Sequence, residues 1–175
     1  MSTTVRPEQP DDFEVIDIII ADAFGSPAEA HLVRHIRATD DHRAELSFVA
    51  VVDDVVVGHV MISDAFLDAG GGTRHAVLML SPLAVSPAHQ RQGIGGALIE
   101  AVKTAADELG EWGVVLQGDP AYYGRFGFVP SADHAITMDL PDWAPPEAAQ
   151  LLPRTAFGNA KTGHLVLPAF FAEFD

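Results

Sequence analysis

The sequence contains no cysteine. Disulfide frameworks and thiolate metal sites both need cysteine sulfur, so neither is available to this chain. The same absence excludes catalysis through a cysteine nucleophile. Any transfer chemistry therefore proceeds most simply without a covalent cysteine intermediate.

Long hydrophobic runs are also missing. No apolar stretch approaches the roughly 18 residues that a membrane span needs. The N-terminal residues, MSTTVRPEQPDD, lack the charged and apolar regions of a secretory signal peptide. These two absences lead us to expect a cytoplasmic protein with no membrane partner.

Basic residues are scarce. Ten Lys and Arg stand against 25 Asp and Glu, which gives a formal net charge of −15. Such a surface repels phosphate backbones, so a nucleic-acid partner is disfavoured. It would attract cationic amines, although an acidic surface that serves only solubility is the plainer interpretation.

The length and the apolar fraction suit one domain. With 175 residues, 48% of them hydrophobic, the chain can build one substantial core and is short for two. We find no internal repeat and no low-complexity tract. We therefore expect residues 1–175 to form a single domain.

Residues 83–98, LAVSPAHQRQGIGGAL, are the most informative stretch. A short apolar run stops at Pro87, and a glycine-rich turn then opens into an apolar-periodic segment, which predicts a strand, a loop and a helix start. Glycines at 93, 95 and 96 can take positive φ and let a ligand approach the backbone. The unpaired N–H groups of a first helical turn, with Arg91 at the lip, would form a cradle for a phosphate or pyrophosphate.

Two common phosphate-binding patterns are absent from this loop. It lacks the GxxxxGK[ST] pattern, so phosphoryl transfer is unsupported. Its glycines also fail to complete GxGxxG, which disfavours a dinucleotide fold. A glycine-rich turn with only a structural role is the remaining alternative for the loop taken alone.

The loop resembles the acyl-CoA loop of the GNAT superfamily of N-acetyltransferases. Residues 90–95, QRQGIG, match the family signature Q/R-x-x-G-x-G/A, and residues 85–87 stand in its V-x-P position. Residues 123–128, YGRFGF, match a second family motif, Y-x-x-x-G-F, in the correct order and at the right distance. The longer stretch GDPAYYGRFGF is similar to a subgroup of small bacterial acetyltransferases of the YhbS type.

The resemblance implies acetyl-CoA as the acyl-donor cosubstrate, with no metal. In the family, backbone groups at the end of the fourth strand bond the pantetheine arm, because that strand splays from its neighbour. Here Ser81-Pro82 interrupts the strand, and proline removes a ladder donor. The residues implied in binding acetyl-CoA are Leu83, Ala84, Val85, Gln90, Arg91, Gln92, Gly93, Ile94, Gly95 and Gly96.

The fold expected from pattern and resemblance is α+β. The resemblance implies a mixed, mostly antiparallel sheet flanked by helices, with a splayed central strand and one parallel βαβ unit. Periodicity predicts helices over 10–23, 27–38 and 93–109, the last with Leu109 in its apolar face. Strands are expected over 4–6, 46–52, 55–65, 75–85, 114–117, 136–140 and 165–167, with Phe170 and Phe171 as core cover. Residues 148–152 look helical by propensity alone, whereas the resemblance implies a strand there.

Tyr123 matches the family's general acid, which protonates the sulfur of coenzyme A. A tyrosine suits this task because its ordinary pKa of about 10 keeps it protonated at neutral pH. The alternatives are that Tyr123 only packs or holds pantetheine. Tyr122 is the second choice and is expected to be structural. A backbone N–H near Val85 could polarise the thioester carbonyl.

No general base is evident. The strand HAVLMLS at 75–81 contains no carboxylate. Asp64, Asp68 or His75 could act through water, although a solvated surface role is the plainer interpretation of each, and bulk water could also serve. The histidines at positions 31, 35 and 42 lack the H-E-x-x-H pattern, so we expect them to be surface histidines and expect no zinc site.

The function implied is an N-acetyltransferase that moves acetyl from acetyl-CoA to a primary amine of a small molecule or peptide by direct sequential transfer. The alternative is a non-catalytic acyl-CoA-binding sensor or partner module. A weaker third interpretation is an enzyme that uses a larger acyl-CoA. The resemblance is compatible with a homodimer, and the sequence does not indicate its surface.

Overall fold

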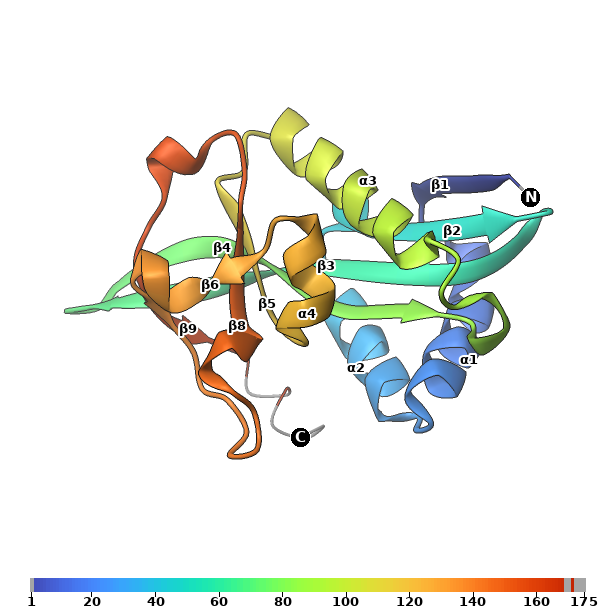
Figure 1. Cartoon of the computed structure of the whole chain (residues 1–175), viewed down its shortest axis with the longest axis horizontal. Helices are drawn as coiled ribbons and strands as arrows, with labels where there is room; N and C mark the ends of the chain where they lie inside the picture. The colour runs from blue at the N-terminus through green and yellow to red at the C-terminus, as the bar shows by residue number, and fades with distance from the viewer. Residues whose placement is uncertain (1, 169–170, 172–175) are drawn as a thin grey trace. The chain divides into compact units, whose positions relative to one another are not determined.

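Figure 1 shows a computed structural model of the chain, which describes residues 2–168 and 171. The described residues belong to two compact units. The first contains residues 2–63, 81–105 and 171, and the second contains residues 64–80 and 106–168. Strands β3 (Val55–Gly70) and β4 (Thr73–Val85) and helix α3 (Ile94–Glu108) contribute residues to both units.

The first unit contains an antiparallel three-stranded segment. Strand β1 (Thr3–Pro7) pairs with β2 (Phe48–Val52), and β2 pairs with the beginning of β3. Asp53 and Asp54 form the connecting turn with φ values of 50° and 65°. Positive φ at both positions is typical of the two-residue turns that match strand twist, so the hairpin expected from the sequence is confirmed.

Two helices cover one face of this segment. Helix α1 (Phe13–Phe24) follows the short 3-10 helix at Pro10–Asp12, and Gly25 ends it in the left-handed conformation with φ 67°. Three residues separate α1 from helix α2 (Ala28–Arg37). The side chains that form the shared apolar core with β2, β3 and β4 are Ile16, Ile19, Ile20, Ala30, Leu32, Val33, Ile36, Val49, Met61 and Ala84.

Helix α3 covers the opposite face of the same strands. Successive residues of a strand point to opposite faces, so Gly58 and Met61 of β3 face different layers. A Cβ placed on Gly58 would lie 3.1 Å from Ile94 Cγ2 and 3.2 Å from Leu98 Cδ1, which shows that α3 packs closely there. Figure 1 shows α3 on one side of β2 and β3 and the α1–α2 pair on the other.

The end of α3 differs from the prediction. The helix stops at Glu108, the N–H of Glu111 bonds the carbonyl of Ala106 at 3.0 Å, and Gly110 takes φ 72°. This bond and the left-handed glycine are features of a Schellman stop. Leu109 lies beyond the helix and is 50% exposed, so the expectation that it belongs to the apolar face is wrong.

The second unit has a mixed strand arrangement. Strand β5 (Gly113–Gln117) pairs in parallel with β4 at Leu78 and Met79. On its other side β5 pairs antiparallel with β8 (Ala149–Pro153), which pairs antiparallel with β6 (Val129–Pro130). The expected parallel unit made by β4, α3 and β5 is confirmed, and so is the strand at β8, whose sequence has helical propensity.

Two short strands complete the second unit. Strand β9 (Gly163–Val166) pairs antiparallel with β3 at residues 66–68 and in parallel with β7 (Ile136–Thr137). The predicted strand at 136–140 is wrong for its last three residues, because the chain turns away before Pro141 and the carbonyl of Asp139 accepts a hydrogen bond from Gln117. The second parallel pair was not expected. Phe170, predicted as core cover, lies outside the described residues.

Candidate functional site

The end of β4 lies in the first unit. Ala84 is buried, while Leu83 and Val85 are half-buried. The side-chain amide of Gln90 donates to the carbonyl of Val85 at 3.0 Å, and the N–H of Ser86 donates to the carbonyl of Val57 at 2.8 Å. The strand end is thus held in place by the loop that follows it and by β3.

The loop after β4 has a left-handed backbone at two positions. Gly93 has φ 82°, which glycine adopts without steric strain, and Arg91 has φ 62°. A non-glycine residue in this region costs roughly 1–3 kcal/mol and is often found at functional sites. Gly95 and Gly96 lie inside α3, so the positive φ considered for them from the sequence does not occur.

The beginning of α3 points a set of N–H groups out of the helix. The first helical bond runs from the N–H of Ala97 to the carbonyl of Gly93 at 3.0 Å. The N–H groups of residues 94–96 therefore precede the bonded ladder and lie at the positive end of the helix dipole. The Ile94 side chain is buried against β3, so only its backbone is available to a ligand.

Tyr123 lies in the second unit, in the short helix α4 (Pro120–Tyr123). Asp119 caps this helix, because its Oδ1 accepts from the N–H of Ala121 at 2.9 Å. The Tyr123 ring packs edge-on against Phe128, with ring centroids 5.5 Å apart, and lies directly over Gly118. A Cβ on Gly118 would be 2.6 Å from the Tyr123 ring.

The surroundings of Tyr123 keep its hydroxyl protonated. Burial raises its pKa well above the ordinary value, and the nearby Tyr122 and Asp119 raise it further. Burial also raises the pKa of Tyr122, whereas Arg125, whose guanidinium lies 4.8 Å from the Tyr122 ring centroid, lowers it. Tyr122 thus packs under Arg125, and the structural role expected for it stays a prediction.

The chain matches the sequence model of an acetyltransferase (GNAT) domain over residues 43–130. It is also 36% identical over 138 residues to the uncharacterized N-acetyltransferase YhbS of Escherichia coli K12, and this match covers 78% of the chain and 80% of that protein. The chain belongs to the GNAT family. It is accordingly an acyltransferase of the GNAT type.

Solved GNAT structures share the fold. YhbS from Escherichia coli, in complex with CoA, matches 99% of the chain with a TM-score of 0.86 and 30% identity, over 93% of its own length. A GNAT acetyltransferase from Brucella melitensis, in complex with acetyl-CoA, matches 97% of the chain with a TM-score of 0.74 and 30% identity, over 98% of its own length. The α+β class and the mixed sheet flanked by helices are therefore those of the GNAT fold.

The candidate bases of this GNAT protein lie on the hairpin of β3 and β4. Asp68 is exposed, and its Oδ1 accepts from the N–H of Gly70 at 2.8 Å, so it supports the hairpin end. Asp64 and His75 are half-buried. The assignment of a base to Asp64, Asp68 or His75 stays a prediction.

The three histidines considered for a zinc site differ in their exposure. His31 and His35 are exposed on α2, as expected. His42 is only 12% exposed, and its Nε2 lies 3.0 Å from Oε1 of Glu8, so the prediction of a surface histidine is wrong at this position. Within residues 2–168 and 171, no group of three or more His, Cys, Asp or Glu side chains could hold a metal ion.

His42 belongs to a buried cluster in the first unit that sequence patterns did not reveal. The Glu8 carboxylate, 2% exposed, accepts a hydrogen bond from Arg37 Nη2 at 3.0 Å and contacts His59 Nε2 at 2.7 Å. Burial alone raises the pKa of Glu8, but its bonds with His42, His59 and Arg37 outweigh burial and hold that pKa far below the ordinary range. No local pattern signals this cluster, because His59 and Glu8 are 51 residues apart.

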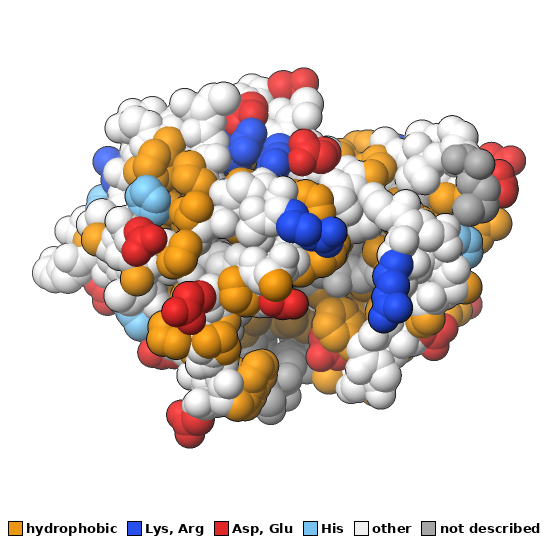
Figure 2. Space-filling view, in the orientation of Figure 1, with side chains coloured by type: hydrophobic (Ala, Val, Ile, Leu, Met, Phe, Trp, Pro, Cys, Tyr) orange, Lys and Arg blue, Asp and Glu red, His pale blue; other side chains and the backbone are white. Residues whose placement is uncertain are grey.

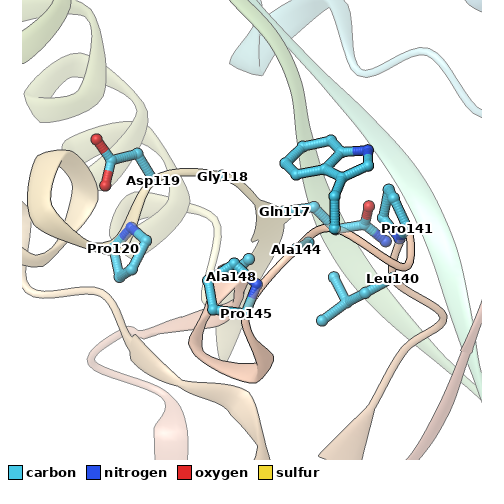
Figure 3. A pocket seen from close by; sticks show the side chains of 10 residues that line it. Gln117, Gly118, Asp119, Pro120, Leu140, Pro141, Ala144, Pro145 and Ala148 are labelled. Carbon is cyan, nitrogen blue, oxygen red and sulfur yellow. The ribbon is translucent and has the colours of Figure 1, made fainter.

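The second unit contains an open cavity of about 510 Å³ (Figure 3). It lies between the end of β5 at Gln117, the first residues of α4 and the segment 140–148. No sequence pattern marks the segment 140–148, so the residues that line the cavity could not be named from the sequence. Among the helices in the described part of the chain, none is long and apolar enough to cross a membrane.

Proposed function

We propose that this GNAT protein transfers the acetyl group of acetyl-CoA to the primary amine of a small molecule or peptide by direct sequential transfer. The observation that carries the proposal is the loop of residues 90–96. There, left-handed Arg91 and Gly93 turn the chain into the first turn of α3, with residues 86–93 between β4 and this helix. The CoA and acetyl-CoA bound to the two solved relatives support acetyl-CoA as the donor.

The residues present fit the pyrophosphate of the donor. A Cβ on Gly93 would meet nothing within 4 Å, so the backbone there is open to an approaching ligand. The N–H groups of residues 94–96 would bond the phosphate oxygens, and the exposed Arg91 would add a positive charge. Backbone groups of Leu83, Ala84 and Val85 would bond the pantetheine arm, as an additional strand does. Gln90 and Gln92 would border the cradle.

Tyr123 supplies the proton donor of the proposed reaction. The neutral amine attacks the thioester carbonyl, a C–N bond forms, and the C–S bond breaks. The leaving thiolate takes its proton from Tyr123, and the proton lost by the amine passes to water. The raised pKa of Tyr123 keeps the hydroxyl protonated, and it also makes this group a weak acid, so its effect comes from position.

The test is thiol release from acetyl-CoA with a panel of amines, combined with calorimetry of acetyl-CoA binding. Tyr123→Phe is expected to lower kcat about 100-fold or more while the Kd of acetyl-CoA stays within twofold. Tyr122→Phe is the matched control, because it removes the hydroxyl of the neighbouring tyrosine. Its kcat is expected to remain within threefold.

Other outcomes assign other functions. Tight binding of acetyl-CoA without release by any amine would support the non-catalytic acyl-CoA-binding sensor. Faster release with longer acyl chains would support an enzyme for a larger acyl-CoA. Absence of acetyl-CoA binding would overturn the assignment of the loop.

A further inference from the structure

The cavity of the second unit has an apolar wall with a prominent aromatic side chain. Leu140, Trp143, Pro145 and Ala148 line it, and Figure 3 shows Leu140, Pro145 and Ala148 on this wall. Trp143 is 84% exposed, the highest value among the large hydrophobic side chains of the described residues. An exposed indole beside an apolar cavity provides a surface that an apolar ligand would cover.

The wall is fixed to the end of β5 by hydrogen bonds. The side-chain amide of Gln117 donates to the carbonyl of Asp139 at 2.7 Å. The N–H of Gly118 donates to the carbonyl of Ala148 at 3.0 Å, and the side-chain amide of Gln150 donates to the carbonyl of Gly118 at 2.9 Å. These bonds fix residues 139 and 148, at the two ends of the wall segment, against the end of β5, which reduces the ordering cost of binding.

The cavity shares residues with the helix of Tyr123. Gly118, Asp119 and Pro120 line the cavity, and they also begin α4 and support the Tyr123 ring. A ligand in the cavity therefore contacts the segment that positions the proposed proton donor. A binding site for the acceptor needs this proximity, because the acceptor must reach the reacting thioester.

The charge of the lining limits the ligand to few positive groups. Of the ten described residues that line the cavity, Asp119 alone carries a formal charge. The Asp119 carboxylate is turned away from Leu140 in Figure 3, and its Oδ1 caps α4. A polyamine or an aminoglycoside would therefore place several charges against uncharged side chains. A volume of about 510 Å³ lies within the range of small-molecule sites.

We propose that this cavity is the acceptor site and that it selects monoamines with an aromatic or branched aliphatic body. The inference rests on the proposed acetyl transfer and names the substrate class for it. Trp143 and Leu140 would contact the apolar body, and Asp119 would attract the ammonium group before it loses its proton.

The first test compares phenethylamine and isoamylamine with ethanolamine and spermidine as acceptors. The two apolar monoamines are expected to have kcat/KM values at least tenfold above those of the other two. Trp143→Ala is expected to raise the KM for phenethylamine at least tenfold, with the KM for acetyl-CoA within twofold. Leu109→Ala is the matched control, because Leu109 is a second exposed large hydrophobic residue of the same unit outside the cavity.

The second test measures binding without turnover. The chain has two tryptophans, so Trp112→Phe leaves Trp143 as the sole indole emitter. Titration with phenethylamine is expected to shift the Trp143 emission to shorter wavelength, and spermidine is expected to leave it unchanged. A shift caused by acetyl-CoA alone would overturn the proposal, since it would assign the cavity to the donor.

The two proposals fail in different ways. Turnover that prefers spermidine, or an unchanged KM for phenethylamine in Trp143→Ala, would overturn the acceptor site and leave the acetyltransferase standing. A Trp143 emission shift with apolar monoamines, combined with no thiol release from any amine, would retain the site as a binding site and overturn the transfer function.

Discussion

Gly118 determines where the Tyr123 ring can lie. The position has no side chain, and the ring edge of Tyr123 occupies the space that a Cβ would take. Any larger residue would therefore displace the ring or bend the segment that begins α4. Displacements of about 1 Å at a catalytic group can lower a rate about 100-fold.

Gly118→Ala is expected to lower kcat at least tenfold while acetyl-CoA binding stays within threefold. The physical reason is the 2.6 Å contact that the new Cβ would make with the ring of Tyr123. Steady-state thiol release and calorimetry measure the two quantities. Gly124→Ala is the control, because a Cβ there meets nothing within 4 Å and the backbone is helical. Equal kcat in both variants would contradict the role given to Gly118.

The motifs that predict this region are local, and the conformations that complete it are not all visible in them. The sequence motif correctly predicts the positive φ of Gly93 and the helix that follows it. It does not predict that Arg91 also takes a left-handed backbone, since arginine has no preference for that region. The contact between Gly118 and Tyr123 likewise needs the folded chain.

At the scale of elements, the docking of α3 on β3 positions the proposed phosphate cradle. Ile94 and Leu98 of the first turns of α3 lie over Gly58, which leaves no room for a side chain between strand and helix. The beginning of the helix, and with it the loop of residues 90–96, is thus held against the strand layer of the first unit.

Gly58→Val is expected to lower the free energy of unfolding by about 1–3 kcal/mol, the usual cost of overpacking a close contact. It is also expected to raise the Kd of acetyl-CoA, because the start of α3 must move outward. Urea unfolding and calorimetry measure the two effects. Gly158→Ala, which adds a Cβ in open space, is the control. If Gly58→Val were destabilised but bound acetyl-CoA with unchanged affinity, the packing of α3 on β3 would not be what positions the acetyl-CoA loop.

The buried cluster around Glu8 makes stability depend on pH. Burial lowers the pKa of His59, and its bond to Glu8 raises that pKa only in part. His59 Nδ1 is buried without a hydrogen-bond partner among the described residues, so a second ring proton has no acceptor. The folded state therefore binds protons less readily than the unfolded chain, whose histidines titrate near 6.5.

Acidification below about pH 6.5 is expected to reduce the free energy of unfolding, because the unfolded state then binds more protons. The lowered pKa of Glu8 acts in the same direction below its unfolded value of about 4.3, with stability lost as the pH falls toward the folded pKa. Urea unfolding at about pH 7.5 and about pH 5.5 measures the slope. His59→Gln is expected to flatten it, whereas the exposed His31→Gln is expected to leave it unchanged. Equal slopes in all three proteins would refute this account.

The helices and the strands of the sheet could largely be predicted, because periodicity and turn residues act over short stretches. Helix α3 differs from its predicted bounds by one residue at each end, and strand β4 begins two residues earlier than predicted and ends at the predicted residue. Residues 138–140, predicted to continue the strand, leave it, and the carbonyl of Asp139 accepts a hydrogen bond from Gln117 instead. The Glu8 cluster could not be predicted, because its members come from distant parts of the chain.

At the scale of the whole molecule, the dominant feature is the negative charge. The formal net charge is −15, and the face shown in Figure 2 carries acidic side chains spread across it. Mutual repulsion of these charges destabilises the compact state. Exposed ion pairs such as Arg34–Asp17 and Lys103–Glu100 offset little of it, since each contributes about 0–1 kcal/mol.

The thermal midpoint at neutral pH is expected to rise by several degrees between about 0.01 M and about 0.15 M sodium chloride. The salt shortens the Debye length from about 30 Å to about 8 Å and so screens the repulsion more than the short ion pairs. Differential scanning calorimetry measures the midpoint. At about pH 5.5, nearer the isoelectric point of 4.6, the rise is expected to be smaller. A midpoint that falls with salt would show that the ion pairs outweigh the repulsion.

The order of the units along the chain has a consequence for synthesis. The main segments of the first unit are complete once residue 105 has left the ribosome, but the hairpin at 64–80 between them belongs to the second unit. That hairpin must wait for residues 106–168, which take roughly 3–13 s to be made at about 5–20 residues per second. A nascent chain stalled in this interval therefore presents the hairpin without its partners to chaperones and proteases.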